Sequence, residues 1–156
     1  MPKTSTRCET RSTRPTSATS RRFASCGSDS VILDTAFVLD LLAGDEGAEQ
    51  KAESLEESGV VMKLPAMTVT ELYIGIGTGV ADEEEERQIR RIIEALPFIP
   101  MDVDLSRRAG RMLGESGNVV GKGDAAIAAA AEREDEAVLT RNVDDFETLG
   151  VDVETY

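Results

Sequence analysis

Acidic side chains stand at four separate points of the chain, each directly after a short apolar run or near the start of a segment with helical character. Carboxylate and carboxamide oxygens are ligands that hard divalent ions such as Mg²⁺ and Mn²⁺ prefer. Ions held in this way can activate water and orient a phosphodiester for in-line attack. The candidates are Asp34 after Val31–Leu33, Glu71 in Thr68–Glu71, Asp124 at the start of an alanine-rich segment, and Asn142, Asp144 and Asp145 after the run ending at Thr140.

The chain lacks residues on which several other kinds of catalytic site depend. It contains no histidine, and its two cysteines, Cys8 and Cys26, both precede residue 30. Serine–histidine–aspartate triads, cysteine–histidine pairs, histidine-ligated zinc and paired-histidine cleavage of RNA are therefore excluded. The chemistry must come from carboxylates, hydroxyls, lysines or arginines.

Short apolar runs alternate with longer amphipathic segments from residue 31 onward, which predicts strands separated by helices. Such strands pair in parallel through right-handed crossovers. We therefore expect an α/β domain with a parallel central sheet of four to five strands flanked by helices. Ligands of open α/β sheets bind beyond the carboxyl ends of the strands, where all four acidic points fall. Strands are expected at 31–33, 60–64, 98–99, 137–140 and 151–153, and helices at 35–43, 45–58, 68–79, 82–95, 105–115 and 124–134.

Each acidic point also has a purely structural interpretation, because carboxylates near helix N-termini satisfy free amides and interact favourably with the helix dipole. Four carboxylates at one edge of one sheet would, however, repel each other unless a cation neutralised them. Together they favour a metal site over four independent caps. The alternative caps would be Thr68 with Glu71, Asn142 with Asp145, and Asp34 and Asp124 at the ends of their helices.

The formal net charge of −13 is unevenly divided along the chain. Residues 30–156 carry 28 acidic and 11 basic residues, a net charge of −17, and the whole chain has 13 arginines but only four lysines. So acidic a surface suits a protein that stays hydrated in concentrated salt, and we expect a halophilic source, with an ordinary acidic cytosolic protein as the alternative. Nucleic-acid binders usually present basic faces, but concentrated salt weakens that argument, and bound cations would reverse the local sign.

Residues 1–29 are rich in Ser, Thr and Arg and show no apolar periodicity. We interpret them as a disordered tail, or as an upstream extension from a misassigned start codon, with one domain at residues 30–156. The Ser20–Phe23 stretch contains two arginines but is not followed by the apolar run of an export signal. No segment approaches the length of a membrane span, so we expect a cytoplasmic protein.

Four motifs contain the acidic points: Val31–Thr35 (VILDT), Thr70–Gly75 (TELYIG), Gly123–Ala129 (GDAAIAA) and Leu139–Phe146 (LTRNVDDF). In their order and spacing they resemble those of the PIN-domain family, and in particular its VapC-type ribonuclease toxins. The resemblance covers about four-fifths of the chain, from residue 30 to the C-terminus. It implies a Rossmann-like PIN fold and a Mg²⁺- or Mn²⁺-dependent endoribonuclease acting on RNA, often tRNA or rRNA. It also implies a cognate antitoxin and a homodimer.

The resemblance also assigns roles to individual residues. Asp34, Glu71 and Asp124 match the first three acidic positions, with Asp34 and Asp124 as the expected direct metal ligands. Asp145, directly before Phe146, matches the fourth position. Asn142 and Asp144 could also contact metal there. The resemblance places the Thr140 hydroxyl beside the same site.

Other charged residues are expected to have structural roles. Asp40 follows Asp34 by six residues, about 240° around a helix, so we expect it to face solvent. Asp102 and Asp104 precede a helix and are expected to cap it. Two arginine groups are expected to pair with acids on their own helices, with phosphate contact as the alternative. The groups are Arg87, Arg90 and Arg91, and Arg107, Arg108 and Arg111; Lys122, beside Asp124, is a further candidate for phosphate.

Competing functions remain open at this stage. A haloacid-dehalogenase-type phosphatase needs a second Asp two residues after the first, but position 36 is Ala. Two rivals share the predicted fold: an RNA-processing nuclease without a toxin role, and a module that binds RNA or an antitoxin without cleavage.

Overall fold

The computed structural model describes residues 30–156, which form five strands and seven helices. The predicted tail at residues 1–29 lies outside the described residues. In chain order the elements are β1 (Ser30–Leu33), α1 (Thr35–Leu42), α2 (Glu46–Glu57), β2 (Val61–Pro65), α3 (Ala66–Gly77), α4 (Glu83–Ala95), β3 (Phe98–Ile99), α5 (Val103–Glu115), α6 (Lys122–Glu134), β4 (Val138–Leu139), α7 (Val143–Thr148) and β5 (Val153–Glu154).

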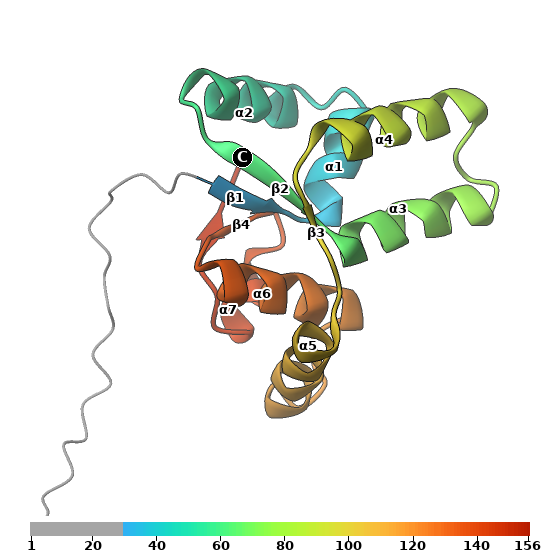
Figure 1. Ribbon diagram of the computed structural model, residues 1–156. Coiled ribbons are helices and arrows are strands. Elements are labelled where there is room, and N and C mark those ends of the chain that lie inside the picture. The colour runs from blue at the N-terminus through green and yellow to red at the C-terminus, as the bar shows by residue number, and fades with distance from the viewer. Residues whose placement is uncertain (1–29) are drawn as a thin grey trace, which may run out of the picture.

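The strands form one parallel sheet in the order β3-β2-β1-β4-β5, which confirms the predicted α/β architecture (Figure 1). In the centre, Ile32 of β1 is in register with Lys63 of β2 on one side and Val138 of β4 on the other. The chain adds β2 and β3 on one side of β1 and then crosses from β3 to β4 on the other side, so the strand order reverses at β1. In sheets of this kind the ligand site lies at the carboxyl ends of the strands flanking that switch.

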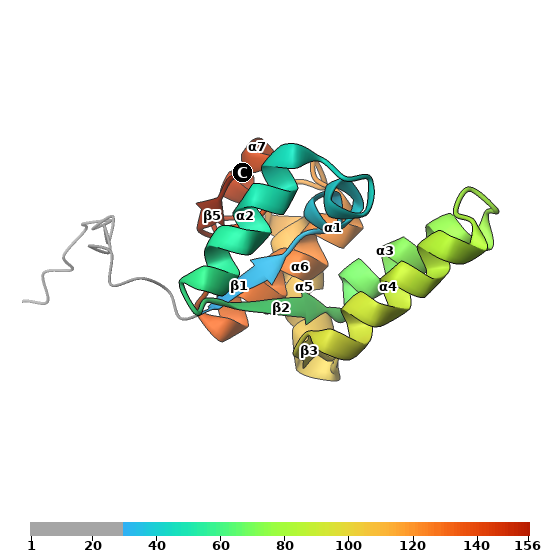
Figure 2. The same cartoon turned by 90° about the horizontal axis from the view of Figure 1, so that it is seen from above.

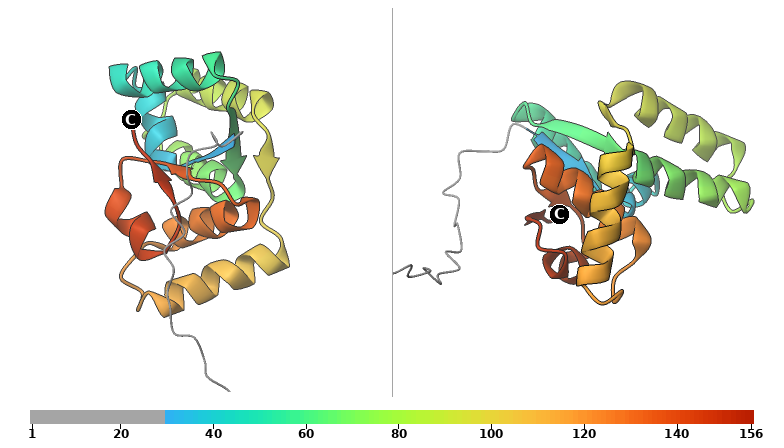
Figure 3. Two further views of the ribbon diagram at one scale, coloured as in Figure 1. Left: turned by 90° about the vertical axis from the view of Figure 1, so that its left-hand side faces the viewer. Right: turned by 60° about the horizontal axis from the view of Figure 1, so that its bottom comes forward.

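Helices cover both faces of the sheet, and successive residues of β1 point into different layers. Ile32 packs with α5, α6 and α7, whereas Val31 and Leu33 pack with α1, α2, α3 and α4. Figure 1 and the left panel of Figure 3 show the sheet between these two layers. A strand buried on both faces must be apolar throughout, which explains why Val31-Ile32-Leu33 is an uninterrupted apolar run.

Helices α3 and α4 form an antiparallel pair that projects from the body of the domain (Figure 2). Leu72 of α3 and Ile89 of α4 are buried in the same apolar layer, so the base of the pair is anchored in the core. The turn between the helices contains Gly79 at φ +74°, a backbone conformation that glycine adopts without strain.

Three helices begin two residues earlier than the sequence predicted; the N-cap of α5, Asp102, is an expected cap, whereas α3 and α6 follow Pro65 and Gly121. Helix α3 begins at Ala66, directly after Pro65, and not at Thr68. Helices α5 and α6 each begin two residues before the predicted position. Helix α7 was not predicted; its six residues are too short for a clear period, yet they bury Phe146 completely.

Among the described residues, no helix is both long enough and apolar enough to span a membrane.

Candidate active site

Asp34 is a nearly fully buried carboxylate at the end of the central strand, with an exposed fraction of 4%. It is the N-cap of α1, and its Oδ1 accepts a hydrogen bond of 2.6 Å from the Thr35 backbone N–H. Its Oδ2 accepts one of 2.6 Å from the Thr140 hydroxyl, which comes from the end of the neighbouring strand β4. Both oxygens are therefore held, and the side chain has a defined orientation. The capping interpretation of Asp34 is correct but does not account for the bond from Thr140.

The loop from Thr140 to Asp145 is organised around the same carboxylate. Thr140 is fully buried, and its Oγ1 accepts a hydrogen bond of 2.9 Å from the Asn142 backbone N–H. The Asn142 amide then donates a bond of 2.6 Å to Asp145 Oδ2. Asp144 is exposed, whereas Asp145 is partly buried. The loop thus brings Asn142 and Asp145 together and leaves Asp144 outside this hydrogen-bonded set.

Glu71 lies on α3, opposite the start of α1 and close to α6. Its Oε2 accepts a hydrogen bond from the Thr35 hydroxyl. Its Oε1 lies so close to Gly123 that a Cβ at that position would collide with it. The predicted capping box of Thr68 and Glu71 is wrong, because the helix begins two residues earlier and Thr68 is inside it. The buried Thr68 hydroxyl instead donates a bond of 2.9 Å to the Leu33 carbonyl.

Asp124 is the third residue of α6, and its Oδ2 accepts a hydrogen bond of 3.1 Å from the Gly121 backbone N–H. This is the capping contact that the structural alternative predicted. The contact does not rule out a second role, because the carboxylate also acts electrostatically on another predicted site residue, Asp34.

The pKa values of Asp34 and Asp124 are both raised, in part by neighbouring acids. Burial is the largest cause of the raised pKa of Asp34, and the charges of Asp124 and Glu71 add to it, against hydrogen bonds from Thr140 and Thr35. The pKa of Asp124 is raised first by burial and also by the charge of Asp145, against the Gly121 hydrogen bond. Asp34 is therefore coupled to Asp124 and Glu71, and Asp124 to Asp145.

In the described part of the chain, the four predicted acids form no ion pair with a basic side chain. Within residues 30–156, ten ion pairs involve Lys or Arg, and none of them includes any of the four predicted acids. Clustered carboxylates without a cation are costly for a folded protein, so their chemistry suits a divalent ion. Across the described residues, however, no three His, Cys, Asp or Glu side chains already form a compact ligand set. The donor types fit a hard ion, and common ligation would require the side chains to draw closer.

Asp40 does not face solvent, so that prediction is wrong. Its side chain is only 16% exposed and forms an ion pair of 2.6 Å with Arg141. It also accepts a hydrogen bond of 2.7 Å from the Tyr156 hydroxyl. The Tyr156 ring packs edge-on against Phe37 with a centroid separation of 4.9 Å. The position of Asp40 on α1 could be estimated from the sequence, but the return of the C-terminus to this helix had no sequence signal.

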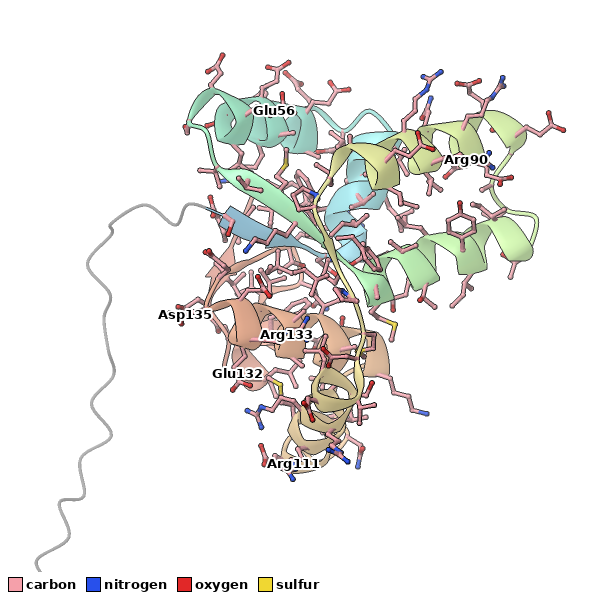
Figure 4. All side chains as sticks on the ribbon, in the orientation of Figure 1. Glu56, Arg90, Arg111, Glu132, Arg133 and Asp135 are labelled. Atoms are coloured by element: carbon pink, nitrogen blue, oxygen red, sulfur yellow. The ribbon has the colours of Figure 1, made fainter. Side chains whose placement is uncertain are left out.

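The other charged residues mostly have the expected structural roles. Asp102 caps α5 by accepting a bond of 2.8 Å from the Leu105 N–H, but Asp104 lies inside the helix and pairs with Arg107. On α4, two arginines pair with acids of the same helix, and on α5 Arg108 pairs with Glu132 of α6. Figure 4 shows Arg90 of α4 and Arg111 of α5 on widely separated parts of the domain. The α4 pairs are Arg87 with Glu84 and Arg90 with Glu86.

A family model for the PIN domain matches residues 31–151, which is most of the chain. The chain belongs to the PIN-domain family. The matched region of this PIN domain runs from β1 to the segment before β5 and includes all four predicted acids. The resemblance inferred from the four motifs is thereby confirmed at the level of the family.

Relatives of this PIN domain include the VapC ribonuclease Y4jK of Sinorhizobium fredii, 29% identical over 132 residues that cover 79% of this chain and 94% of the relative. A VapBC2 complex of Rickettsia felis bound to a promoter DNA fragment matches with a TM-score of 0.70, 17% identity and coverage of 81% and 98% of the two chains. A DNA-bound VapBC of Salmonella typhimurium has a TM-score of 0.70 and 24% identity, with 81% and 97% covered.

Another match to this PIN domain is VapC20 of Mycobacterium tuberculosis, described as a sarcin-ricin loop cleaving toxin. Its TM-score is 0.63 at 18% identity, with 78% of this chain and 95% of VapC20 covered. These three solved structures and the present chain share the same fold.

Proposed function

We propose that this PIN domain is a Mg²⁺- or Mn²⁺-dependent endoribonuclease and the toxin of a VapBC-type toxin–antitoxin pair. The observation that carries the proposal is the set of four electrostatically coupled acids, from three helices and one strand end, that lacks a basic partner within the described residues. The VapC ribonuclease of Sinorhizobium fredii, which aligns over nearly its whole length, supports the same activity.

In this proposal Asp34, Glu71, Asp124 and Asp145 hold the metal, with Asn142 and Asp144 as lesser candidates. The bound ion would supply positive charge to the phosphodiester and lower the pKa of a water molecule. The protein's own contribution is to orient the acids. The Thr140 hydroxyl stabilises ionised Asp34 inside a buried site that otherwise disfavours its charge.

The neighbouring polar groups orient the remaining acids in the same way. Thr35 links two elements, because its N–H bonds Asp34 and its hydroxyl bonds Glu71. Asn142 fixes Asp145 through its side-chain amide. An array of oxygens held in advance by such contacts loses little freedom when it binds an ion or a substrate.

The proposed partners are an RNA substrate such as tRNA or rRNA, a cognate antitoxin, and a second copy of this chain. The VapBC complexes with the same fold support an antitoxin. Large apolar side chains exposed on α1, on α3 and in the turn after α3 offer a surface that a protein partner would bury. They are Leu39, Tyr73, Ile74 and Val80.

The acidity of the chain bears on the conditions of the reaction. With a net charge of −17 on residues 30–156, RNA is repelled over long range in dilute buffer, and concentrated salt screens that repulsion. We therefore propose that the protein works in a high-salt interior, as a halophile would provide.

The test is cleavage of structured RNA by the purified full-length chain in concentrated KCl with Mn²⁺. We expect cleavage by the native protein, and its loss in Asp34→Asn and Asp124→Asn variants that keep the native circular dichroism spectrum. Unchanged cleavage by both variants would contradict the proposed site. RNA binding without any cleavage would favour the non-cleaving module.

The toxin role has a separate test. The adjoining open reading frame is co-expressed with the chain, and the purified material is assayed for a complex and for cleavage. A toxin requires a small partner that forms a complex and suppresses cleavage. An active nuclease with no such partner would instead be an RNA-processing enzyme.

A further inference from the structure

Arg141 is a cationic residue in the loop that also supplies the predicted site residues Thr140, Asn142 and Asp145. It stands between Thr140, whose hydroxyl bonds Asp34, and Asn142, whose N–H bonds Thr140 and whose amide bonds Asp145. The backbone on both sides of Arg141 is therefore fixed by contacts within the acidic site. Among the ion pairs of residues 30–156, this is the one whose cation belongs to that loop.

The Arg141 guanidinium is held at one point and exposed over the rest. Its Nη1 lies 2.6 Å from Asp40 Oδ2, and its side chain is 63% exposed while that of Asp40 is 16% exposed. A guanidinium has several N–H donors in one plane, and a single carboxylate oxygen occupies only part of them. The remaining donors are suited to the oxygens of a phosphate.

Tyr156 fixes the carboxylate that fixes Arg141. Its hydroxyl donates to the same Asp40 oxygen at 2.7 Å, and its ring packs against the fully buried Phe37. The pKa of Tyr156 is raised by burial and by Asp40, and Asp34 adds to the effect while Arg141 opposes it. Arg141 directly follows Thr140, whose hydroxyl bonds Asp34, so this group borders the acidic site.

An acidic cluster needs a nearby cation if it is to receive an anionic substrate. A phosphodiester approaching four carboxylates is repelled by them, and metal neutralises only the centre of the cluster. Arg87 and Arg90 of α4 and Arg108 of α5 form ion pairs with acids of helices. Arg141 is a cation within the loop that supplies Thr140, Asn142 and Asp145 to the site.

We propose that Arg141 binds a backbone phosphate of the RNA beside the acidic cluster, and that Asp40 and Tyr156 are positioning residues that aim its guanidinium. The inference rests on the proposed ribonuclease function and extends it by naming a substrate contact. The Asp40 pair reduces the freedom of a long side chain before the substrate arrives, so less entropy is lost when the phosphate binds.

The experiment uses the full-length protein, Mn²⁺ and a structured RNA, with cleavage kinetics, RNA binding by fluorescence anisotropy over a range of salt concentrations, and thermal melting. For Arg141→Ala we expect KM and the dissociation constant to rise about tenfold, as loss of one charged hydrogen-bonded contact predicts. We expect kcat to stay nearly unchanged. The magnitude of the slope of log affinity against log salt should fall by about one, the value for one lost phosphate contact.

Two further substitutions separate positioning from simple stabilisation. Arg141→Lys keeps the charge, so its salt slope should stay near that of the native protein. Tyr156→Phe keeps the ring on Phe37 but removes the hydrogen bond to Asp40. Because Arg141 keeps its charge but is aimed less well, KM should rise and the salt slope should stay near that of the native protein. Arg141→Gln, which keeps side-chain length without charge, replaces Arg141→Ala if the latter does not fold.

Arg87→Ala is the matched control, because the Arg87 side chain is 61% exposed and lies 2.6 Å from its partner Glu84. Arg87→Ala should leave KM and the salt slope unchanged. Equal losses for the two alanine variants would overturn the inference, as would a lower melting temperature for Arg141→Ala with KM and slope unchanged. If the native protein binds RNA without cleaving it, the proposed nuclease function fails, but the salt slope of Arg141→Ala still tests the phosphate contact. If the native protein cleaves RNA and Arg141→Ala changes neither KM nor the salt slope, the Arg141 inference fails and the nuclease function stands.

Discussion

The Thr140 hydroxyl donates a hydrogen bond of 2.6 Å to Asp34 Oδ2, and both side chains are buried at the carboxyl ends of adjacent parallel strands. The bond joins the loop after β4 to the centre of the site. It also opposes the burial that raises the pKa of Asp34. The position of a single hydroxyl thus influences whether a buried carboxylate is charged.

Thr140→Val should weaken cleavage and change its pH dependence. Valine matches the size of threonine but leaves Asp34 Oδ2 without its donor, which costs about 1–3 kcal/mol for a buried acceptor. Because the lost bond favoured the ionised form, the pKa of Asp34 should rise further, and the acid limb of the pH–rate profile should move to higher pH. A profile with an unchanged acid limb would show that Asp34 ionisation does not control the rate. Thr140→Ser, which keeps the hydroxyl, should retain the native profile.

Asp124→Asn should stabilise the metal-free protein at neutral pH. A pKa raised in the folded state means that the folded protein binds more protons, so stability falls as pH rises above the ordinary value of 3.8. Asparagine removes this penalty and keeps an oxygen for the Gly121 N–H. Melting temperatures should show an advantage for Asp124→Asn at neutral pH that disappears near and below pH 3.8.

Asp102→Asn is the control of opposite sign for that measurement. The pKa of Asp102 is lowered, first by the Leu105 N–H bond and also by Arg133, so its charge stabilises the fold above its ordinary pKa. Asp102→Asn should therefore lower the melting temperature at neutral pH, and the difference should shrink as the pH falls. If Asp124→Asn behaved like Asp102→Asn, the raised pKa of Asp124 would be wrong.

Gly123→Ala should displace Glu71 and slow cleavage. A methyl group at position 123 would collide with Glu71 Oε1, so the carboxylate must move away from the site. Displacement of a catalytic group by about 1 Å costs about a hundredfold in rate. Cleavage rates of the purified variant, with melting temperature as a check on folding, test this.

Gly110→Ala provides the control, because a Cβ at position 110 on the exposed side of α5 meets nothing within 4 Å. The same chemical change there should leave cleavage intact and stabilise the helix by about 0.5–1 kcal/mol. Native activity in Gly123→Ala would show that Glu71 does not need its observed position.

Asp145→Asn and Asp144→Asn should separate the two candidates for the fourth acid. Asp145 is partly buried, bonded by Asn142 and coupled to Asp124, whereas Asp144 is exposed. We expect Asp145→Asn to lower the cleavage rate about 10- to 100-fold, as typical for groups around a metal site, and Asp144→Asn to leave it near native. The reverse order would assign the fourth position to Asp144.

The sequence predicted the sheet and the acids at its edge because both depend on local patterns. Strands buried on two faces are short apolar runs, and an acid directly after such a run lies at the carboxyl edge of a parallel sheet. Asp34 could be placed at that edge on this ground alone. Glycine and proline marked most of the element ends, to within about two residues.

The contacts that orient the acids depend on elements far apart in the chain, and here sequence reasoning failed. The spacing of Thr68 to Glu71 allows a capping box as the structural alternative, but the Thr68 hydroxyl instead donates to the Leu33 carbonyl. The helical angle of Asp40 suggested solvent, but the returning C-terminus supplies Tyr156. The closeness of Gly123 to Glu71 follows from the packing of α3 against α6, which no local motif encodes.

Mn²⁺ binding to the full-length protein, measured by isothermal titration calorimetry and by the paramagnetic signal of free Mn²⁺, tests the central claim most directly. The native protein should bind Mn²⁺ and gain melting temperature from it. The Asp34→Asn/Asp124→Asn double variant should do neither, although it folds and melts cooperatively. Equal Mn²⁺ binding by the native protein and the double variant would contradict the assignment of this acidic cluster as a metal site.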